Sequence, residues 1–495
     1  MFSKLFINLK KNHFWGFLFI LVISFVPRFV MLFTNRLMSF GTEQGMDLLF
    51  AKDIVVNHIF PLAGSNRTYV WHILKGPGWY YFLSIPFILG NGDPFWAKAA
   101  TGLVSVATII ISYFILKSVF NLKTAIAVCI LLSISPWLIE ITGQIWPPYI
   151  VIFPVALFLF GVMKFLQKKQ RFAILIALSI GLMVQFEIAI AVFYIVQLLI
   201  LIPLVVKYKY ISYKMLFLSF FVLFLFFLPN VIYDLTHSFY STGGFSILIT
   251  ELVRGGFGNV IHLLAQRVDV FTWNFRSTFS PNIIKSFCLL SIIYLGAYLF
   301  TKDKKIARFK KIFLIYLVLT PLSKILIMFF YPGAVPAWHL LDLSIIYCFA
   351  LGIIFGYFFK KPVLKIFSVA VLLGLIIMFS MRMSEIFRNE FLFSFGINRI
   401  AQATPVNYIF ADAKGQQFTY TPLDAGQQRF DFDYLFWWYG AKKYGYQPST
   451  NKQKINYFIL DKNVAGNQTF PKNLTGKVVN KKDFQNGFSV IKVVQ

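Results

Sequence analysis

Long apolar stretches alternate along this chain with short polar and basic ones. A helix that crosses a membrane needs about 20 mainly apolar residues, because hydrocarbon offers no hydrogen-bond partner to free backbone groups. We therefore predict an all-α polytopic membrane protein with about eleven transmembrane helices. These are expected at 14–33, 97–117, 123–141, 148–166, 172–188, 189–206, 215–233, 281–300, 310–331, 338–359 and 362–381.

One further apolar stretch, 79–89, is too short to span and contains Pro86. Charge decides its status. If 79–89 does not cross, all the basic clusters between spans fall on the side of the N-terminus; if it crosses, they all change sides. Because basic loops stay in the cytoplasm, we predict that 79–89 is an interfacial helix and that the N-terminus is cytoplasmic. The clusters are Lys117/Lys123, Lys168/Lys169/Arg171, Lys207/Lys209/Lys214, Lys302 to Lys311, and Lys360/Lys361/Lys365.

This topology divides the chain into a transmembrane domain, 1–381, and a small extracytoplasmic α/β domain, 382–495. It also places two long loops outside, at 34–96 and 234–280. In the second domain, strand-like pieces occur at 406–410, 418–421, 455–460 and 476–479, and a helix is expected at 430–439. The dipeptide Asn486-Gly487 predicts a hairpin turn before the run 488–494.

The composition of the chain excludes several classes of protein. Hydrophobic residues make up 58% of the 495 residues, and 47 basic against 19 acidic side chains give a net charge of +28. In a soluble protein this excess would suggest nucleic acid, but here most of it lies in the cytoplasmic clusters, so no nucleic-acid partner is expected. The three cysteines all lie in apolar runs, which excludes a disulfide framework or a thiolate metal site.

The first outer loop holds the candidate chemistry. Apolar residues recur at helical spacing over 47–59, which predicts an amphipathic helix at the outer interface, with Glu43 and Asp47 one turn apart at its entrance. A carboxylate there can act as a general base on an acceptor. The alternative is an acidic cap on a solvated surface helix.

The order of residues in this loop resembles a known family. Glu43, then the pair Lys52-Asp53, a proline-containing stretch, and Lys75-Gly76-Pro77 leading into 79–89 resemble the GT-C class of membrane glycosyltransferases. The likeness is to the branch of the protein O-mannosyltransferases and lipid A aminoarabinose transferases. It continues less specifically through 135–148, 181–187 and 229–239, and so covers most of residues 1–360.

The resemblance implies an enzyme that uses a polyprenyl-phosphate sugar as donor. Glu43 falls on the family's acidic residue at the acceptor, with Asp47 as a second catalytic candidate, and Lys75 on its lysine at the lipid-linked phosphate. Further cations could hold the phosphate: Arg254, Arg267, Lys324 and His339. Each has a plainer explanation: surface pairing for the arginines and for Arg276, snorkelling for Lys324, and a helix-start histidine for His339.

The resemblance breaks at one position. The aminoarabinose branch carries a second aspartate where this chain has Pro147, and the nearest acids are Glu140 and Glu187. A divalent cation requires several oxygen ligands, so a metal-assisted mechanism is disfavoured here, and no cofactor is assigned. The aromatic run 436–439 is expected to be core of the small domain rather than a sugar-stacking surface.

We therefore expect a glycosyltransferase that moves a sugar, with inversion by family resemblance, from a polyprenyl-phosphate donor to an envelope acceptor at the outer face of a bacterial inner membrane. The acceptor can be lipid, protein or glycan. A transporter or flippase would instead show inverted repeats and broken helices in matching positions, which we do not find by inspection. A polymerase or ligase of lipid-linked saccharides is the nearer alternative.

Overall fold

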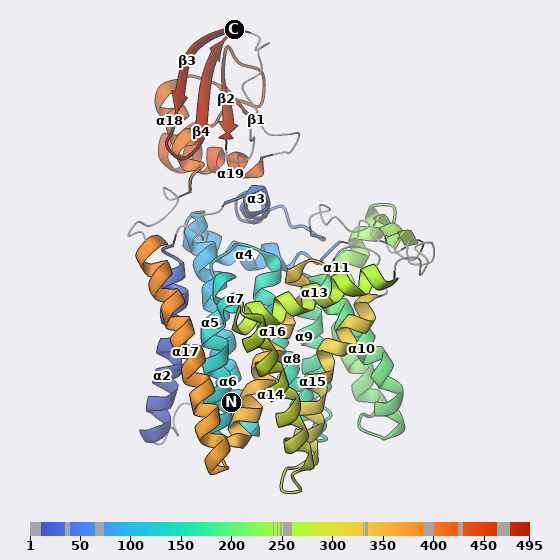
Figure 1. Cartoon of the computed structure of the whole chain (residues 1–495). Helices are drawn as coiled ribbons and strands as arrows, with labels where there is room; N and C mark the ends of the chain where they lie inside the picture. The colour runs from blue at the N-terminus through green and yellow to red at the C-terminus, as the bar shows by residue number, and fades with distance from the viewer. Residues whose placement is uncertain are drawn as a thin grey trace.

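The computed structural model describes residues 11–34, 40–64, 74–240, 242–244, 246–247, 250, 260–329, 331, 335–390, 400–423, 429–462 and 476–495. Its helices form a long bundle that carries a small sheet domain at one end (Figure 1). We call this the domain end. The turns that hold the predicted basic clusters lie at the opposite end, which we call the basic end (Figure 1). The structure thus places these clusters on one side, as the charge pattern required.

Nine helical segments of the described chain are long and apolar enough to cross a membrane, and α4, α6 and α9 are shorter apolar helices. The predicted spans all fall on helices. In chain order the helices are α2 (Lys11–Met31), α3 (Thr42–Val56), α4 (Gly78–Leu89), α5 (Pro94–Val119), α6 (Leu122–Ile134), α7 (Pro136–Glu140), the 3-10 helix η2 (Pro147–Val151), α8 (Ile152–Leu166), α9 (Phe172–Phe186), α10 (Ile188–Lys207), α11 (Tyr213–Thr236), α13 (Val260–Phe279), α14 (Ile283–Lys302), α15 (Arg308–Phe329), the 3-10 helix η4 (Ala337–Leu340), α16 (Leu341–Phe358), α17 (Pro362–Glu390), α18 (Ala403–Ala413), α19 (Phe430–Tyr439) and the π-helix Gly440–Tyr444.

Helix α16 forms the centre of the bundle, since each of its residues is buried. Two glycines on α16 allow a close approach to α6. A Cβ at Gly352 would lie 2.8 Å from the backbone of Val128, and one at Gly356 would lie 2.8 Å from the Cα of Thr124. Helices in lipid gain stability from such close packing rather than from exclusion of water. The sequence did not reveal which predicted span occupies the centre.

One predicted span is broken near the domain end. The span expected at 123–141 is two helices, α6 and α7, because Ser135 and Pro136 interrupt it. Arg28 of α2 lies at this break, buried, and donates hydrogen bonds to the carbonyls of Leu132 and Ser133 and to Ser105 Oγ. These carbonyls have lost their helical partners, so Arg28 caps the end of α6 inside the bundle.

We expect Arg28→Met to lower stability by about 2 kcal/mol, because the buried acceptors at the end of α6 would lose their donor. The measurement is the thermal midpoint of the purified protein in detergent. Arg171→Met is the matched control, since Arg171 is exposed at the basic end. Equal midpoints for Arg28→Met and wild type would show that Arg28 is not a cap.

The domain at the other end of the chain is a mixed sheet with two helices against it. Its strands are β1 (Thr419–Leu423), β2 (Ile455–Asp461), β3 (Lys477–Asp483) and β4 (Phe488–Val494), in the order β1-β2-β4-β3. β1 and β2 are parallel and the other pairs antiparallel. Tyr457, Ile459 and Val490 share one face of the sheet and pack with residues of α18 and α19.

Predictions for this domain were mostly confirmed. Helix α19 and strands β1, β2 and β3 lie where the pattern placed them, and β3 and β4 pair as the predicted hairpin. The strand expected at 406–410 was wrong, because these residues lie in helix α18. Helix α17 also continues to Glu390, beyond the predicted end of the last span at 381.

The sheet domain does not stand apart from the bundle. Helix α3 lies between α19 and α4 (Figure 1), and residues of all three helices belong to one hydrophobic core. Trp437 of α19 stacks on Phe87 of α4, with ring centroids 5.8 Å apart. Tyr434 Oη donates to the carbonyl of Gly92, and Trp438 Nε1 donates to that of Asn91 at 3.2 Å. The domain thus holds the helix that carries the candidate acids.

Candidate active site

Helix α3 begins earlier than the pattern suggested. It runs from Thr42 to Val56 rather than over 47–59, because Gln44 Oε1 accepts a hydrogen bond from the Gly41 amide at 2.8 Å and caps the first turn. Glu43 is exposed in this first turn, whereas Asp47 is buried one turn later. The two predicted carboxylates therefore share one helix but lie in different environments.

Asp47 is held by a tryptophan of the neighbouring helix. Trp79 Nε1 of α4 donates a hydrogen bond to Asp47 Oδ2 at 2.8 Å. Burial raises the pKa of Asp47 to about 7, and the negative charge of Glu43 acts in the same direction, while Lys75 and the Trp79 bond oppose it. Asp47 thus lies within electrostatic reach of both Glu43 and Lys75.

The raised pKa of Asp47 predicts a pH dependence of stability. Between about pH 4 and pH 7 the folded protein keeps a proton that the unfolded chain has lost, so folding is favoured at the lower pH. That stabilisation is lost as the pH rises towards 7. We expect the thermal midpoint of wild type, relative to Asp47→Asn, to fall over this range and then level off. Asp53→Asn on the same helix is the control, and a difference independent of pH would contradict the prediction.

The segment that carries Lys75 is fixed on both sides by backbone hydrogen bonds. The Lys75 carbonyl accepts from the Gly64 amide at 2.8 Å and from Asn230 Nδ2 at 3.3 Å. The Gly76 amide donates to the carbonyl of Val184 at 3.2 Å. The half-buried Lys75 side chain is therefore placed by α9 and α11, two helices far from it in sequence.

Gln185, at the end of α9, was not recognised from the sequence. Its Oε1 accepts from the Gly78 amide at 2.8 Å, and its Nε2 donates to the Phe226 carbonyl of α11 at 2.6 Å. A Cβ at Gly76 would lie 2.4 Å from the Gln185 side chain, so glycine permits this approach. The available signal was a single amide in an otherwise apolar span, which is costly unless it is bonded.

His339 lies on η4, close to a second acid. Its Nε2 is 3.7 Å from Glu187 Oε1, and Lys75, Lys324 and Asp342 are within electrostatic reach. Next to it, Trp338 packs on Trp146 with ring centroids 4.6 Å apart, and Trp146 contacts Tyr149 at 5.2 Å. Tyr149 in turn lies within reach of the charge of Glu43. These residues connect the surroundings of Glu43 with those of Lys75.

Lys324 is buried inside the bundle and does not snorkel to the membrane interface, so the plainer explanation given for it from the sequence was wrong. Its ammonium donates to Asp342 Oδ1 at 2.5 Å and to the His339 carbonyl at 2.8 Å, and Lys324 and Asp342 are both 0% exposed. Tyr194 Oη donates to the other oxygen of Asp342 at 2.9 Å. A charge pair of this kind is kept inside a membrane when each member is bonded. The contacts of Lys324 favour a role in holding η4 and His339.

The arginines of the second loop also differ from one another. Arg267 of α13 is 0% exposed and donates to the carbonyls of Met328 and Tyr331, at the end of α15. Its contacts therefore favour the capping of α15. Arg276 donates to the carbonyl of Pro281 rather than to an acidic partner. Arg254 lies outside the described residues.

The described chain offers no cluster of three or more His, Cys, Asp or Glu side chains that could hold a metal ion. Of the two acids considered as substitutes, Glu140 pairs with Arg382 of α17, and Glu187 faces His339.

Lys52 and Asp53 form an ion pair at 2.7 Å on α3, and Lys52 lies over the Trp437 ring of α19 at 5.9 Å. This pair therefore lies at the boundary with the sheet domain.

Comparison with solved structures identifies the architecture. ArnT from Cupriavidus metallidurans bound to undecaprenyl phosphate superposes with a TM-score of 0.56 over 97% of both chains, at 9% sequence identity. The chain has the ArnT fold. ArnT in the apo state gives a TM-score of 0.45 at 10% identity, covering 96% of this chain and 97% of that one. The oligosaccharyltransferase of Archaeoglobus fulgidus gives 0.46 at 15% identity, covering 80% of this chain and 55% of that one. The sequence matches no family model and no curated protein.

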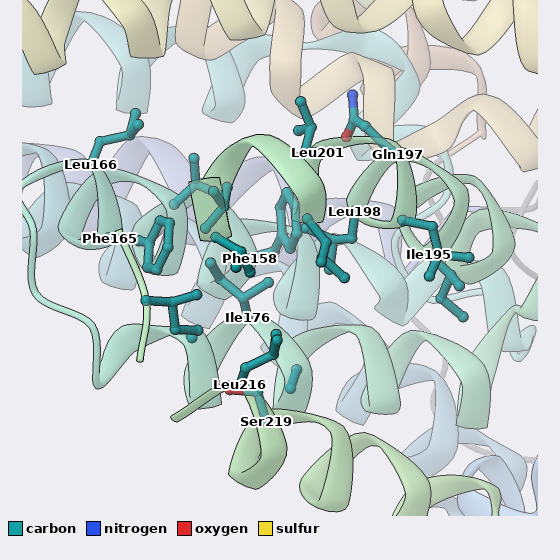
Figure 2. Close-up of a pocket in the computed structure, with 18 of the residues that line it drawn as sticks. Phe158, Phe165, Leu166, Ile176, Ile195, Gln197, Leu198, Leu201, Leu216 and Ser219 are labelled. Atoms are coloured by element: carbon teal, nitrogen blue, oxygen red, sulfur yellow. The ribbon is translucent and has the colours of Figure 1, made fainter. Parts of the chain in front are cut away.

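Within the ArnT fold, an apolar cavity of about 410 Å³ lies between α8, α9, α10, α11 and α15 (Figure 2). Apolar side chains such as Phe158, Ile176 and Leu198 form most of its wall, with Gln197 and Ser219 among the few polar ones (Figure 2). The residues that α9 contributes lie about ten positions before Gln185, or roughly 15 Å along the helix. The cavity is therefore separate from the candidate acids but shares α9 and α11 with the Lys75 segment.

Proposed function

We propose that this protein is a membrane glycosyltransferase that transfers a sugar from a polyprenyl-phosphate donor to an envelope acceptor at the domain end. One observation carries the proposal. Asp47, one helical turn after Glu43, lies within electrostatic reach of both Glu43 and Lys75 at one end of a bundle with the ArnT fold. The ArnT structure that shares this fold was solved with undecaprenyl phosphate, the kind of carrier that the proposal requires.

In this proposal Lys75 and His339 hold the phosphate of the donor. Lys75 supplies the positive charge, and the imidazole of His339, within electrostatic reach of it, supplies a hydrogen-bond donor. Negative charge develops on the phosphate oxygen as the sugar leaves, so a fixed cation and a hydrogen-bond donor beside it stabilise the transition state more than the ground state. Lys324 then acts through His339, whose carbonyl it holds, and Arg267 acts on the fold by capping α15.

Glu43 is the proposed general base. The oxygen of the acceptor hydroxyl attacks the anomeric carbon while the bond from that carbon to the phosphate oxygen breaks, and Glu43 receives the hydroxyl proton. Its exposure suits a group that must meet an incoming acceptor. Attack from the side opposite the phosphate would invert the anomeric centre. Asp47, bonded to Trp79 of α4, is proposed to hold the first turns of α3, and with them Glu43, in place against α4.

The hydrocarbon part of the donor also requires a place. The apolar cavity of Figure 2 shares α9 and α11 with the Lys75 segment, and its wall suits a prenyl chain. We propose that the basic end faces the cytoplasm, following the positive-inside rule, and that the membrane is the inner membrane of a bacterium. Labelling tests the orientation: in a cysteine-free background, a cysteine at position 442 is expected to react from outside and one at 305 is not.

The deciding experiment is transfer by the purified protein from labelled polyprenyl-phosphate sugars to membrane extracts and defined acceptors. We expect release of polyprenyl phosphate together with a labelled product. Donor turnover that requires the acceptor distinguishes transfer from simple hydrolysis. If no such donor is consumed but a lipid-linked sugar crosses reconstituted vesicles, the protein is a flippase and the proposal is wrong.

A further inference from the structure

A second cavity, of about 590 Å³, opens on the side of the bundle near the domain end. Three parts of the chain form it: the break between α6 and α7, the turn between α13 and α14, and the last turns of α17. None of Glu43, Asp47, Lys75 or His339 lines it. The cavity, which we call the α14–α17 cleft, is thus distinct from the candidate active site.

The rim of the α14–α17 cleft is charged. Lys285, in the first turn of α14, and Glu385, near the end of α17, both line it and are both exposed. Among the described residues the Lys285 ammonium has only Met378 Sδ as a side-chain partner, at 3.3 Å, and a thioether is a weak acceptor. Arg382 also lines the rim, where it pairs with Glu140. No ion pair within the described chain joins Lys285 to Glu385, so the rim keeps one charge of each sign for a ligand.

The floor of the cleft is apolar. Leu131, Ile134 and Leu375 line it, and Leu375 lies seven residues before Arg382 on α17, or about 10 Å deeper along the helix. The headgroup layer of a membrane is roughly 5–7 Å thick on each side of the hydrocarbon. Along α17 the cleft is therefore charged towards the domain end and apolar further from it, the same order as the headgroup and the acyl chains of a lipid in the leaflet at the domain end.

We propose that the α14–α17 cleft binds a phospholipid with an ethanolamine headgroup from the leaflet at the domain end. Lys285, supported by Arg382, contacts the phosphate, and Glu385 accepts hydrogen bonds from the primary ammonium. A choline headgroup carries no N–H to donate, and a glycerol headgroup carries no positive charge for Glu385. The cleft is therefore selective by charge and by hydrogen bonding at once. This inference does not depend on the proposed glycosyl transfer.

The test is native mass spectrometry of the full-length protein in detergent, titrated with dioleoyl phosphatidylethanolamine, phosphatidylglycerol or phosphatidylcholine. We expect one ethanolamine lipid to bind about three- to tenfold more tightly than the other two. Lys285→Gln should weaken all three lipids, whereas Glu385→Gln should remove the preference for ethanolamine over choline. Lys302→Gln on α14 and Arg388→Gln on α17 are the controls, because neither residue lines the cleft.

Three results would overturn the proposal. The first is tighter binding of phosphatidylglycerol than of phosphatidylethanolamine by wild type. The second is wild-type binding by Lys285→Gln, and the third is an unchanged preference in Glu385→Gln. Soluble glycerophosphoethanolamine is added as a competitor, and its displacement of the lipid at equal concentration would assign the site to a free headgroup metabolite instead. Thermal midpoints equal to wild type confirm that each variant is folded.

Discussion

Glu43→Gln is expected to lower the rate of sugar transfer by about 10²- to 10⁴-fold, the contribution that a positioned general base usually makes. Glutamine keeps the shape of the side chain but cannot receive the proton of the acceptor hydroxyl. Because Glu43 is exposed in the first turn of α3, the change leaves the packing of the helix intact. The effect should therefore fall on kcat, measured with saturating donor and acceptor.

Donor binding provides the internal check on this prediction. The phosphate is assigned to Lys75 and His339, so Glu43→Gln should bind polyprenyl phosphate as wild type does, whereas Lys75→Gln should bind it more weakly. Asp53→Asn is the matched control on the same helix, since Asp53 is paired with Lys52 on the domain side. Full activity of Glu43→Gln would remove the assignment of the base while leaving the donor site untouched.

The positions of the apolar helices could be predicted because each is a local property of 20 or so residues. Which residues are buried within the bundle could not be predicted in this way, because burial depends on which helices pack against each other. Lys324 illustrates this limit. Its sequence neighbourhood is consistent with a lysine near a helix end, and only the fold brings Asp342 within 2.5 Å of it. The hydropathy pattern cannot identify the partner of a residue when the two are far apart in sequence and adjacent only in the fold.

Helix α18 shows how a local pattern can mislead. Val406, Ile409 and Phe410 are apolar and β-branched or aromatic, which is typical of a strand over five residues. Over a longer window Val406, Ile409, Phe410 and Ala413 recur at helical spacing, and each of them is buried. The window of 406–410 was too short to separate the two periods.

Some residues of the candidate site were predicted from the sequence and others were not. Glu43, Asp47 and Lys75 were predicted because the order of residues in one loop resembles a family, and in the structure Asp47 lies within electrostatic reach of both Glu43 and Lys75. Trp79 and Gln185, which hold Asp47 and the Lys75 segment, were not singled out, because their roles arise from contacts between separate helices. The part played by the sheet domain was also left open, although it packs directly against α3.

That packing depends on a glycine of α3. A Cβ at Gly45 would lie 2.4 Å from the backbone nitrogen of Asp431 and from the carbonyl oxygen of Phe430, at the start of α19. Backbone atoms cannot rotate away as a flexible side chain can. The start of α19 is also fixed, because Asp431 accepts hydrogen bonds from Arg429 and from Gln402. A larger residue at position 45 would therefore force α3 and the start of α19 apart.

We therefore expect Gly45→Ala to lower the transfer rate by about 10- to 100-fold, because a displacement of roughly 1 Å at a reacting group has an effect of this size. Glu43 lies two residues before Gly45 and would move with it. Overpacking should also lower the thermal midpoint, by the equivalent of about 1–3 kcal/mol. Gly41→Ala is the matched control, since a Cβ there would meet only the flexible Gln44 side chain, at 3.0 Å.

The two readouts separate a misplaced base from an unfolded protein. A Gly45→Ala variant that binds polyprenyl phosphate normally but transfers sugar slowly would mean that the Lys75 segment is intact and that α3 alone has shifted. This is the expected outcome, because α9 and α11 hold the Lys75 segment independently of α19. Wild-type transfer by Gly45→Ala would instead mean that the position of α3 does not depend on the sheet domain, and the domain would then need another role.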